Sequence, residues 1–122
     1  MTIESYRDLR VWRQAMDLAE ASYRLTAGFP TDELFGMTSQ IRRASVSIAA
    51  NIAEGYGRES TGSYAQFLRV AQGSLKELET HLLLSQRVGL TSSALVEPLL
   101  ELSDGIGRML RSLIRSIERT AE

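Results

Sequence analysis

Apolar residues recur at intervals of three and four along most of the chain, and no segment shows the alternation of a half-buried strand. This period is typical of amphipathic α-helices. Glycine and proline interrupt the pattern, so we expect four helices over residues 6–27, 32–54, 63–88 and 94–119. Because the connections are short, the pattern predicts an all-α fold, an antiparallel up-down-up-down four-helix bundle.

Each expected helix carries an apolar stripe that we assign to one of its faces. In the second helix the stripe has spacings of 4, 3, 4 and 4, which keep it narrow. The four stripes are Trp12, Met16, Ala19 and Tyr23, with Leu9, Ala15 and Leu18 beside them; Met37, Ile41, Ala44, Ile48 and Ile52; Tyr64, Phe67, Leu68, Ala71, Leu75, Leu78 and Leu82; and Leu95, Leu99, Leu102, Ile106, Met109, Leu110, Leu113 and Ile117.

Local signals set the expected helix ends. Gly28 and Pro30 end the first helix, and Thr31 is the expected N-cap of the second. Gly55 and Gly57 begin the loop after the second helix.

Glycine also ends the third helix, where Gly89 followed by Leu90 predicts a Schellman-type stop. In the fourth helix, Pro98 requires either a start near Glu97 or a bend, because proline removes a backbone donor. Gly105 and Gly107 are expected to mark close contact between helices.

A polar line runs beside the apolar stripe of the second helix. Its spacings of 3, 4, 4 and 3 place all its members on one side. The third helix has a comparable line with spacings of 3, 4 and 4. These lines are either solvated faces or paired polar groups between helices or subunits, and we favour the second interpretation, with Arg43 pairing with Glu54 or Glu77. The two lines are Gln40, Arg43, Ser47, Asn51 and Glu54, and Ser74, Glu77, His81 and Ser85.

Further apolar residues exceed what one bundle interior can hold. A second apolar area on a small domain usually marks self-association, so we expect a homo-oligomer. These residues are Val11, Leu25, Phe35, Val46, Val70, Leu83, Leu84, Leu100 and Ile114.

Length and composition limit the remaining possibilities. The 122 residues suit a single domain over residues 1–122, and the chain has no cysteine, which fits a reducing cytosol. The first residues lack a signal-peptide pattern, and no stretch reaches the roughly 20 apolar residues of a membrane span. We therefore expect a soluble cytoplasmic protein without membrane contact.

Charge gives two alternatives for nucleic acid. The net charge of −1 argues against a bulk electrostatic attraction to RNA or DNA. A line of arginines in the fourth helix, spaced 3, 4 and 4, is nevertheless a candidate phosphate contact. The alternative, which we favour, is compensation of the helix dipole, with acidic residues in the first half of the helix and basic ones in the last. The line consists of Arg108, Arg111, Arg115 and Arg119, and Arg42, Arg58 and Arg69 are candidates for a second patch.

Catalytic and metal sites find little support. The chain has one histidine, His81, which cannot complete the two Glu-x-x-His motifs of a di-metal bundle. It has no Gly-x-Ser-x-Gly motif, and Gly55-Tyr56-Gly57 follows a helix and not a strand. We therefore expect no enzyme, no catalytic residue, no cofactor and no metal.

Several segments resemble the signature of a bacterial four-helix-bundle family named for open reading frames in intervening sequences of 23S rRNA genes. The resemblance covers about residues 6–117. The segments are Leu9-Arg10-Val11-Trp12, Phe29-Pro30, Gln40-Ile41-Arg42-Arg43-Ala44, Ser47-Ile48, Asn51-Ile52-Ala53-Glu54-Gly55, Tyr64-Ala65-Gln66-Phe67-Leu68 and Ala71-Gln72-Gly73-Ser74-Leu75-Lys76-Glu77-Leu78-Glu79.

The resemblance implies a bundle that assembles as a ring, typically a homopentamer. It also implies a relationship to accessory proteins of diversity-generating retroelements, which are basic barrels that bind nucleic acid and a reverse transcriptase. This chain departs from them in its net charge of −1. Our leading hypothesis is an oligomeric scaffold that also binds a partner, and the alternative is an RNA- or DNA-binding accessory protein that uses the arginine line.

Overall fold

Four α-helices make up most of the computed structural model, which describes residues 2–121. They are α1 (Arg10–Thr26), α2 (Met37–Tyr56), α3 (Thr61–Arg87) and α4 (Ser93–Ala121). Two short 3₁₀ turns, η1 (Tyr6–Asp8) and η2 (Thr31–Glu33), precede α1 and α2, and residues 2–121 contain no strand. The expected all-α fold with four helices is therefore confirmed.

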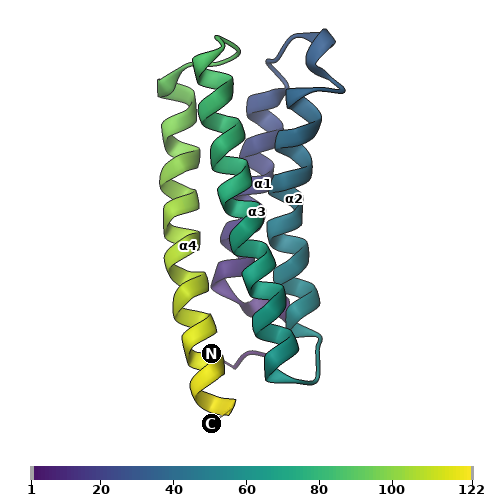
Figure 1. Ribbon diagram of the computed structural model, residues 1–122, viewed down its shortest axis with the longest axis vertical. Helices are drawn as coiled ribbons and strands as arrows, with labels where there is room; N and C mark the ends of the chain where they lie inside the picture. The colour runs from purple at the N-terminus through teal and green to yellow at the C-terminus, as the bar shows by residue number, and fades with distance from the viewer. Residues whose placement is uncertain (1, 122) are drawn as a thin grey trace.

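The helices lie side by side in a bundle (Figure 1). The α1–α2 and α3–α4 connections are at one end, and the α2–α3 connection is at the other (Figure 1). Helix α1 packs against α2 and α4, and α3 packs against the same two helices. Each helix therefore has one side toward the interior and one side away from it.

Large aliphatic side chains from all four helices fill the interior. Burial of each such side chain stabilises the fold by roughly 1.5–3 kcal/mol. The largest fully buried side chains include Leu18 of α1, Ile41, Ile48 and Ile52 of α2, Leu68, Leu75, Leu78 and Leu82 of α3, and Ile106 and Leu110 of α4. The expected stripes of α2 and α3 are confirmed by these residues.

The core face of α1 differs from the most conspicuous apolar stripe in its sequence. Val11, Ala15 and Leu18 are buried, whereas Met16 and Tyr23 are 46% and 44% exposed. The expectation that Val11 lies outside the core was wrong, and the same holds for Ile114. Small residues on the core face let α1 approach its neighbours closely, which leaves the bulkier stripe at the margin between α1 and α2.

The start of α2 also differs from the expectation. Residues 31–33 form a separate 3₁₀ turn, so Thr31 does not cap α2, which begins at Met37. The Glu33 carboxylate accepts a hydrogen bond of 3.0 Å from the backbone N–H of Met37. An acidic side chain thus satisfies one free N–H of α2 from outside the helix.

Two expected stops have different outcomes. Gly89 has φ of +83°, and the N–H of Leu90 donates to the Ser85 carbonyl at 2.9 Å, so the Schellman stop after α3 is confirmed. Gly55 is not a loop residue but a buried member of α2.

The start of α4 excludes one of the two alternatives for Pro98. The helix begins at Ser93 and includes Pro98, so the later start is excluded. Leu95, expected to point inward, is 59% exposed, and Val96 is buried in its place. Gly107 is buried, and a Cβ there would lie 3.4 Å from Leu75 of α3, whereas Gly105 has only looser neighbours.

Candidate interaction surfaces

The polar lines of α2 and α3 meet at the boundary between these helices. The hydroxyl groups of Ser47 and Ser74 are 2.8 Å apart, and one donates to the other. The Asn51 side-chain amide donates to the carbonyl and the hydroxyl of Ser47, at 2.8 and 3.0 Å. All three side chains are half-buried. The middle of the predicted line is therefore a hydrogen-bonded cluster within one chain.

The outer members of the same lines face away from the interior. Gln40, Arg43, Glu54 and Glu77 are exposed. Among the described residues Arg43 forms no ion pair with either glutamate, and Glu77 instead lies 3.3 Å from the ring nitrogen of His81. Ser85 is buried, away from this line, and its hydroxyl has no hydrogen-bond partner within residues 2–121. The predicted polar lines thus include both residues exposed to solvent and a residue, Ser85, that is buried in the bundle.

An apolar groove follows the boundary between α1 and α2. One hollow of about 610 Å³ and a second of about 610 Å³ share Tyr23 and Val46, so they join into one continuous surface. We call this surface the α1–α2 groove. Its main apolar lining residues are Tyr6, Trp12, Met16, Ala19 and Tyr23 on one side, Val46, Ala49, Ala50 and Ala53 on the other, and Leu34 and Phe35 at one end.

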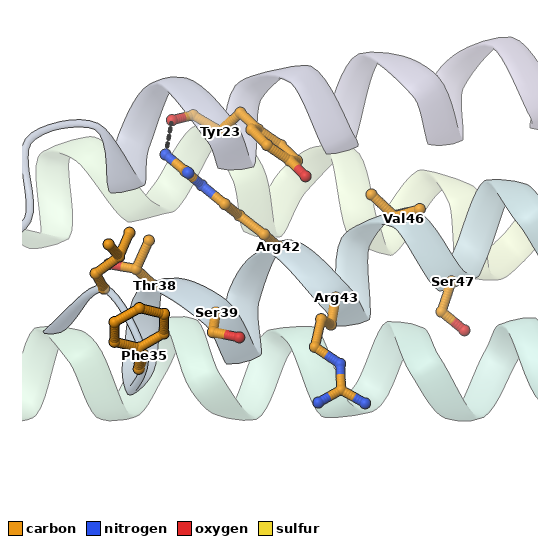
Figure 2. Close-up of a pocket in the computed structure, with 9 residues that line it drawn as sticks. Tyr23, Phe35, Thr38, Ser39, Arg42, Arg43, Val46 and Ser47 are labelled. Atoms are coloured by element: carbon orange, nitrogen blue, oxygen red, sulfur yellow. Dashed lines mark hydrogen bonds between the residues drawn. The ribbon is translucent and has the colours of Figure 1, made fainter.

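Figure 2 shows the end of the groove nearest the α1–α2 connection. The Arg42 side chain crosses to α1, donating to the Thr26 hydroxyl at 2.9 Å and to the Tyr23 carbonyl at 3.5 Å. Its guanidinium lies 4.6 Å from the centroid of the Tyr23 ring. Arg42 therefore fixes Tyr23 at the wall of the groove. Phe35, which lines the same end of the groove, is 93% exposed.

The exposed sides of α1 and α2 differ in character. The exposed side of α1 is charged, with Arg13, Asp17, Glu20 and Arg24. The exposed side of α2 combines Val46 and Ala50 with the polar residues Gln40, Arg43 and Glu54. A solvated helix face is normally polar, so Val46 and Ala50 are the atypical residues on this side of α2.

A second apolar patch lies on the exposed side of α3 near its C-terminal end. Leu83 and Leu84 are 48% and 44% exposed there, and Val88 just after the helix is 62% exposed. The space beside them, about 550 Å³, is lined by this one helix alone and is therefore open to solvent. We call it the α3 patch; its lining residues are Thr80, Leu83, Leu84, Gln86 and Arg87.

All four arginines of the predicted line are exposed along α4. Arg108 pairs with Asp104 one turn earlier. Arg111, Arg115 and Arg119 form no ion pair within the described part of the chain. The structure therefore leaves three adjacent guanidinium groups on this helix open to solvent.

The second proposed arginine patch does not form. Arg42 turns toward α1, Arg69 pairs with Glu118 of α4, and Arg58 lies over the Phe67 ring at 4.6 Å. Because these side chains are held by different partners on different helices, they do not make one surface.

Tyr64 is a titratable group whose pKa is displaced from its ordinary value. Burial, and secondarily the neighbouring Tyr56, raises the pKa of Tyr64 to about 12. Its ring meets the Tyr56 ring edge-on at 6.1 Å between centroids. Over residues 2–121 no three His, Cys, Asp or Glu side chains gather as metal ligands. No helix in the same range combines the length and apolar character needed to cross a membrane.

Comparisons with known proteins agree on one family. A family model described as 23S rRNA-intervening sequence protein matches residues 7–112. A crystal structure of a protein of unknown function from Bacteroides thetaiotaomicron, described as a member of the S23 ribosomal protein family, is 26% identical with a TM-score of 0.77. That match covers 85% of this chain and 97% of the other. No curated protein gives a significant match.

Proposed function

Since the chain belongs to the 23S rRNA-intervening sequence protein family, we propose that it is an oligomeric scaffold that acts by binding and not by catalysis. In this proposal antiparallel up-down-up-down bundles associate side by side into a ring, with five copies as the family resemblance implies. The α1–α2 groove is the observation that carries the proposal, because it is a long apolar surface on a small chain.

Two features support a ring over a two-fold dimer. The α1–α2 groove and the α3 patch lie on different helices, so one chain presents two unlike apolar surfaces. A two-fold contact uses the same surface on both subunits, whereas two unlike surfaces make head-to-tail contacts, which form a ring when the rotation between neighbouring copies closes.

Light scattering after size exclusion tests the proposal. At micromolar concentration we expect the mass of several chains. Ala50→Glu places a charge in the α1–α2 groove and should reduce the mass to that of one chain. The matched control is Ala94→Glu, since Ala94 is also an exposed helical alanine but lies outside the groove. A single-chain mass for the unaltered protein would refute the proposal.

A second candidate function is favoured by the arginines of α4. Arg111, Arg115 and Arg119 are exposed and form no ion pair among the described residues, so they are available to phosphates of RNA or DNA. Copies arranged in a ring would repeat this line around the assembly.

Filter binding at increasing salt tests this candidate. Phosphate contacts would make binding fall steeply with salt, and Arg115→Ala should reduce the slope by about one unit. Arg13→Ala on the exposed side of α1 is the matched control and should leave the slope unchanged. Absence of binding to a mixed-sequence RNA and DNA at low salt would exclude the candidate.

A further inference from the structure

Phe35 is the most exposed large apolar side chain of the described residues, at 93%. It follows Leu34, which is 46% exposed, in the connection between α1 and α2. An aromatic side chain of this kind buries about 150–250 Å² when another surface covers it. Its exposure to water therefore leaves a large hydrophobic free energy of burial unused. The chain does not cover Phe35 itself.

The α3 patch has the character that such a side chain needs. Leu83 and Leu84 supply apolar contact, and the open space beside them measures about 550 Å³. Because all its lining residues belong to α3, the patch is an open apolar surface on which a phenylalanine ring can lie, bordered by the aliphatic parts of Thr80 and Arg87.

The two features lie at the same end of the bundle. The connection that carries Phe35 and the connection that follows α3 are both at the end shown uppermost in Figure 1. Leu83 and Leu84 are in the last turn and a half of α3, which ends at Arg87. Rotation about an axis parallel to the helices keeps each feature at its own height. In a ring of parallel copies Phe35 therefore comes level with the α3 patch of the next copy.

Charges near the two features are complementary. Asp32 is exposed and precedes Phe35 by three residues, and Arg87 is exposed and follows Leu84 by three residues. Neither forms an ion pair among the described residues. An aspartate beside the protruding ring and an arginine beside the receiving patch favour contact between unlike surfaces and disfavour contact between like ones.

Resting on the self-assembly proposed above, we propose that Phe35 of one copy packs against the α3 patch of a neighbouring copy, with Asp32 facing Arg87. The occupant of the patch is thus a second copy of this chain. The contact is directional, because each copy donates one ring and receives another.

Disulfide trapping tests the contact, since the chain has no native cysteine. One preparation carries only Phe35→Cys and another only Leu84→Cys, and the two are mixed, dissociated and reassembled before oxidation. Because each chain has one thiol, a link between the two kinds of chain is a link between copies. Disulfides require Cα atoms within about 7 Å, so a covalent heterodimer should accumulate only if the contact forms.

Val70→Cys replaces Leu84→Cys as the matched control. Val70 is 45% exposed, against 44% for Leu84, and it lies 14 residues earlier on the same side of α3. At 1.5 Å per residue the two positions are about 21 Å apart. We expect at least ten times more covalent heterodimer with Leu84→Cys than with Val70→Cys. Equal yields, or Phe35→Cys chains that link mainly to one another, would overturn the inference.

A charge exchange provides an independent measurement. Asp32→Arg should weaken assembly at least ten-fold, and adding Arg87→Asp should restore it. If the unaltered protein is oligomeric but neither the heterodimer nor the restoration is seen, this contact is wrong and the scaffold proposal stands. If the unaltered protein is a single chain, the scaffold proposal and the proposed contact are both wrong.

Discussion

At the scale of single residues, Gly55 sets the distance between α2 and α3. A Cβ at this position would lie 2.8 Å from the Cβ of Phe67 and 3.2 Å from the carbonyl oxygen of Tyr64. The second contact is with backbone, which cannot rotate away. Only a residue without a side chain lets the two helices pack this closely.

Substitution at Gly55 should therefore destabilise the bundle. Gly55→Ala overpacks the α2–α3 contact, and we expect a loss of about 1–3 kcal/mol in the free energy of unfolding. The control is Gly73→Ala in α3, where a Cβ meets nothing within 4 Å, and there a gain of roughly 0.5–1 kcal/mol is expected. Urea denaturation measures both, and a Gly55→Ala variant as stable as the unaltered protein would contradict the packing described.

Tyr64 gives the molecule a pH dependence above pH 10. Its pKa rises from 10.0 to about 12 in the folded chain, so the folded state holds the proton more tightly than the unfolded state. The resulting stabilisation is complete below pH 10 and is lost as pH rises toward 12.

Comparing unfolding midpoints at pH 9 and pH 11 measures this effect. Tyr64→Phe should lose less stability between the two pH values than the unaltered protein, because it has no phenol to ionise. Tyr6→Phe, which removes the phenol of the ring that packs on Trp12, is the control and should lose as much as the unaltered protein. The same decline in Tyr64→Phe and in the unaltered chain would rule out this role.

At the scale of the helices, the polar residues of α2 fall into two groups. Some form hydrogen bonds at the boundary with α3, and others are exposed to solvent. Asn51 makes two hydrogen bonds to Ser47 within the α2–α3 boundary, whereas Arg43 on the same predicted line is exposed. Asn51→Ala should reduce the free energy of unfolding by about 1 kcal/mol. Arg43→Ala should change it by less than about 0.5 kcal/mol.

Thermal or urea unfolding of the two variants checks this difference. Light scattering on the same samples shows whether Arg43 contributes to assembly instead. A stability loss in Arg43→Ala comparable with that in Asn51→Ala would mean that the polar line acts as one unit.

Helix patterns in the sequence predicted the cores of α2 and α3, but that of α1 only in part, since Ala15, Leu18 and Ala19 are buried whereas Met16 and Tyr23 are exposed. In α2 a single apolar stripe leaves one choice of inward face. In α1 two apolar stripes lie side by side, one with Val11, Ala15 and Leu18 and one with Trp12, Met16 and Tyr23. Size favoured the second stripe, but close helix packing selected the smaller side chains. Periodicity alone does not distinguish adjacent faces.

The 3₁₀ turn before α2 was hidden by a similar ambiguity. Thr31, Asp32 and Glu33 have the composition of a helix start, and they do begin a helical turn. The turn ends before Gly36, and Glu33 caps α2 from four residues before its first residue, Met37. Such a cap depends on how the turn folds back, which spacing does not reveal.

At the scale of the whole molecule, the candidate surfaces were predicted as sets of residues but not as shapes. Phe35, Val46, Leu83 and Leu84 stood out as surplus apolar residues, and all four are exposed. Their division into a groove on α1 and α2 and a patch on α3 depends on which helices are neighbours. The sequence shows which apolar side chains exceed the needs of the core. Their positions on the surface depend on which helices pack against each other.

The exposed side of α4 has an asymmetric charge distribution along the helix. Glu97, Glu101 and Asp104 occupy the first half of its exposed side, and the arginines at 108, 111, 115 and 119 occupy the second. Copies placed in parallel around an axis would repeat this separation, with the acidic half of every α4 toward one rim and the basic half toward the other. A polyanion would then approach from one rim only. Negatively charged gold particles seen in electron micrographs at both rims equally would contradict this polarity.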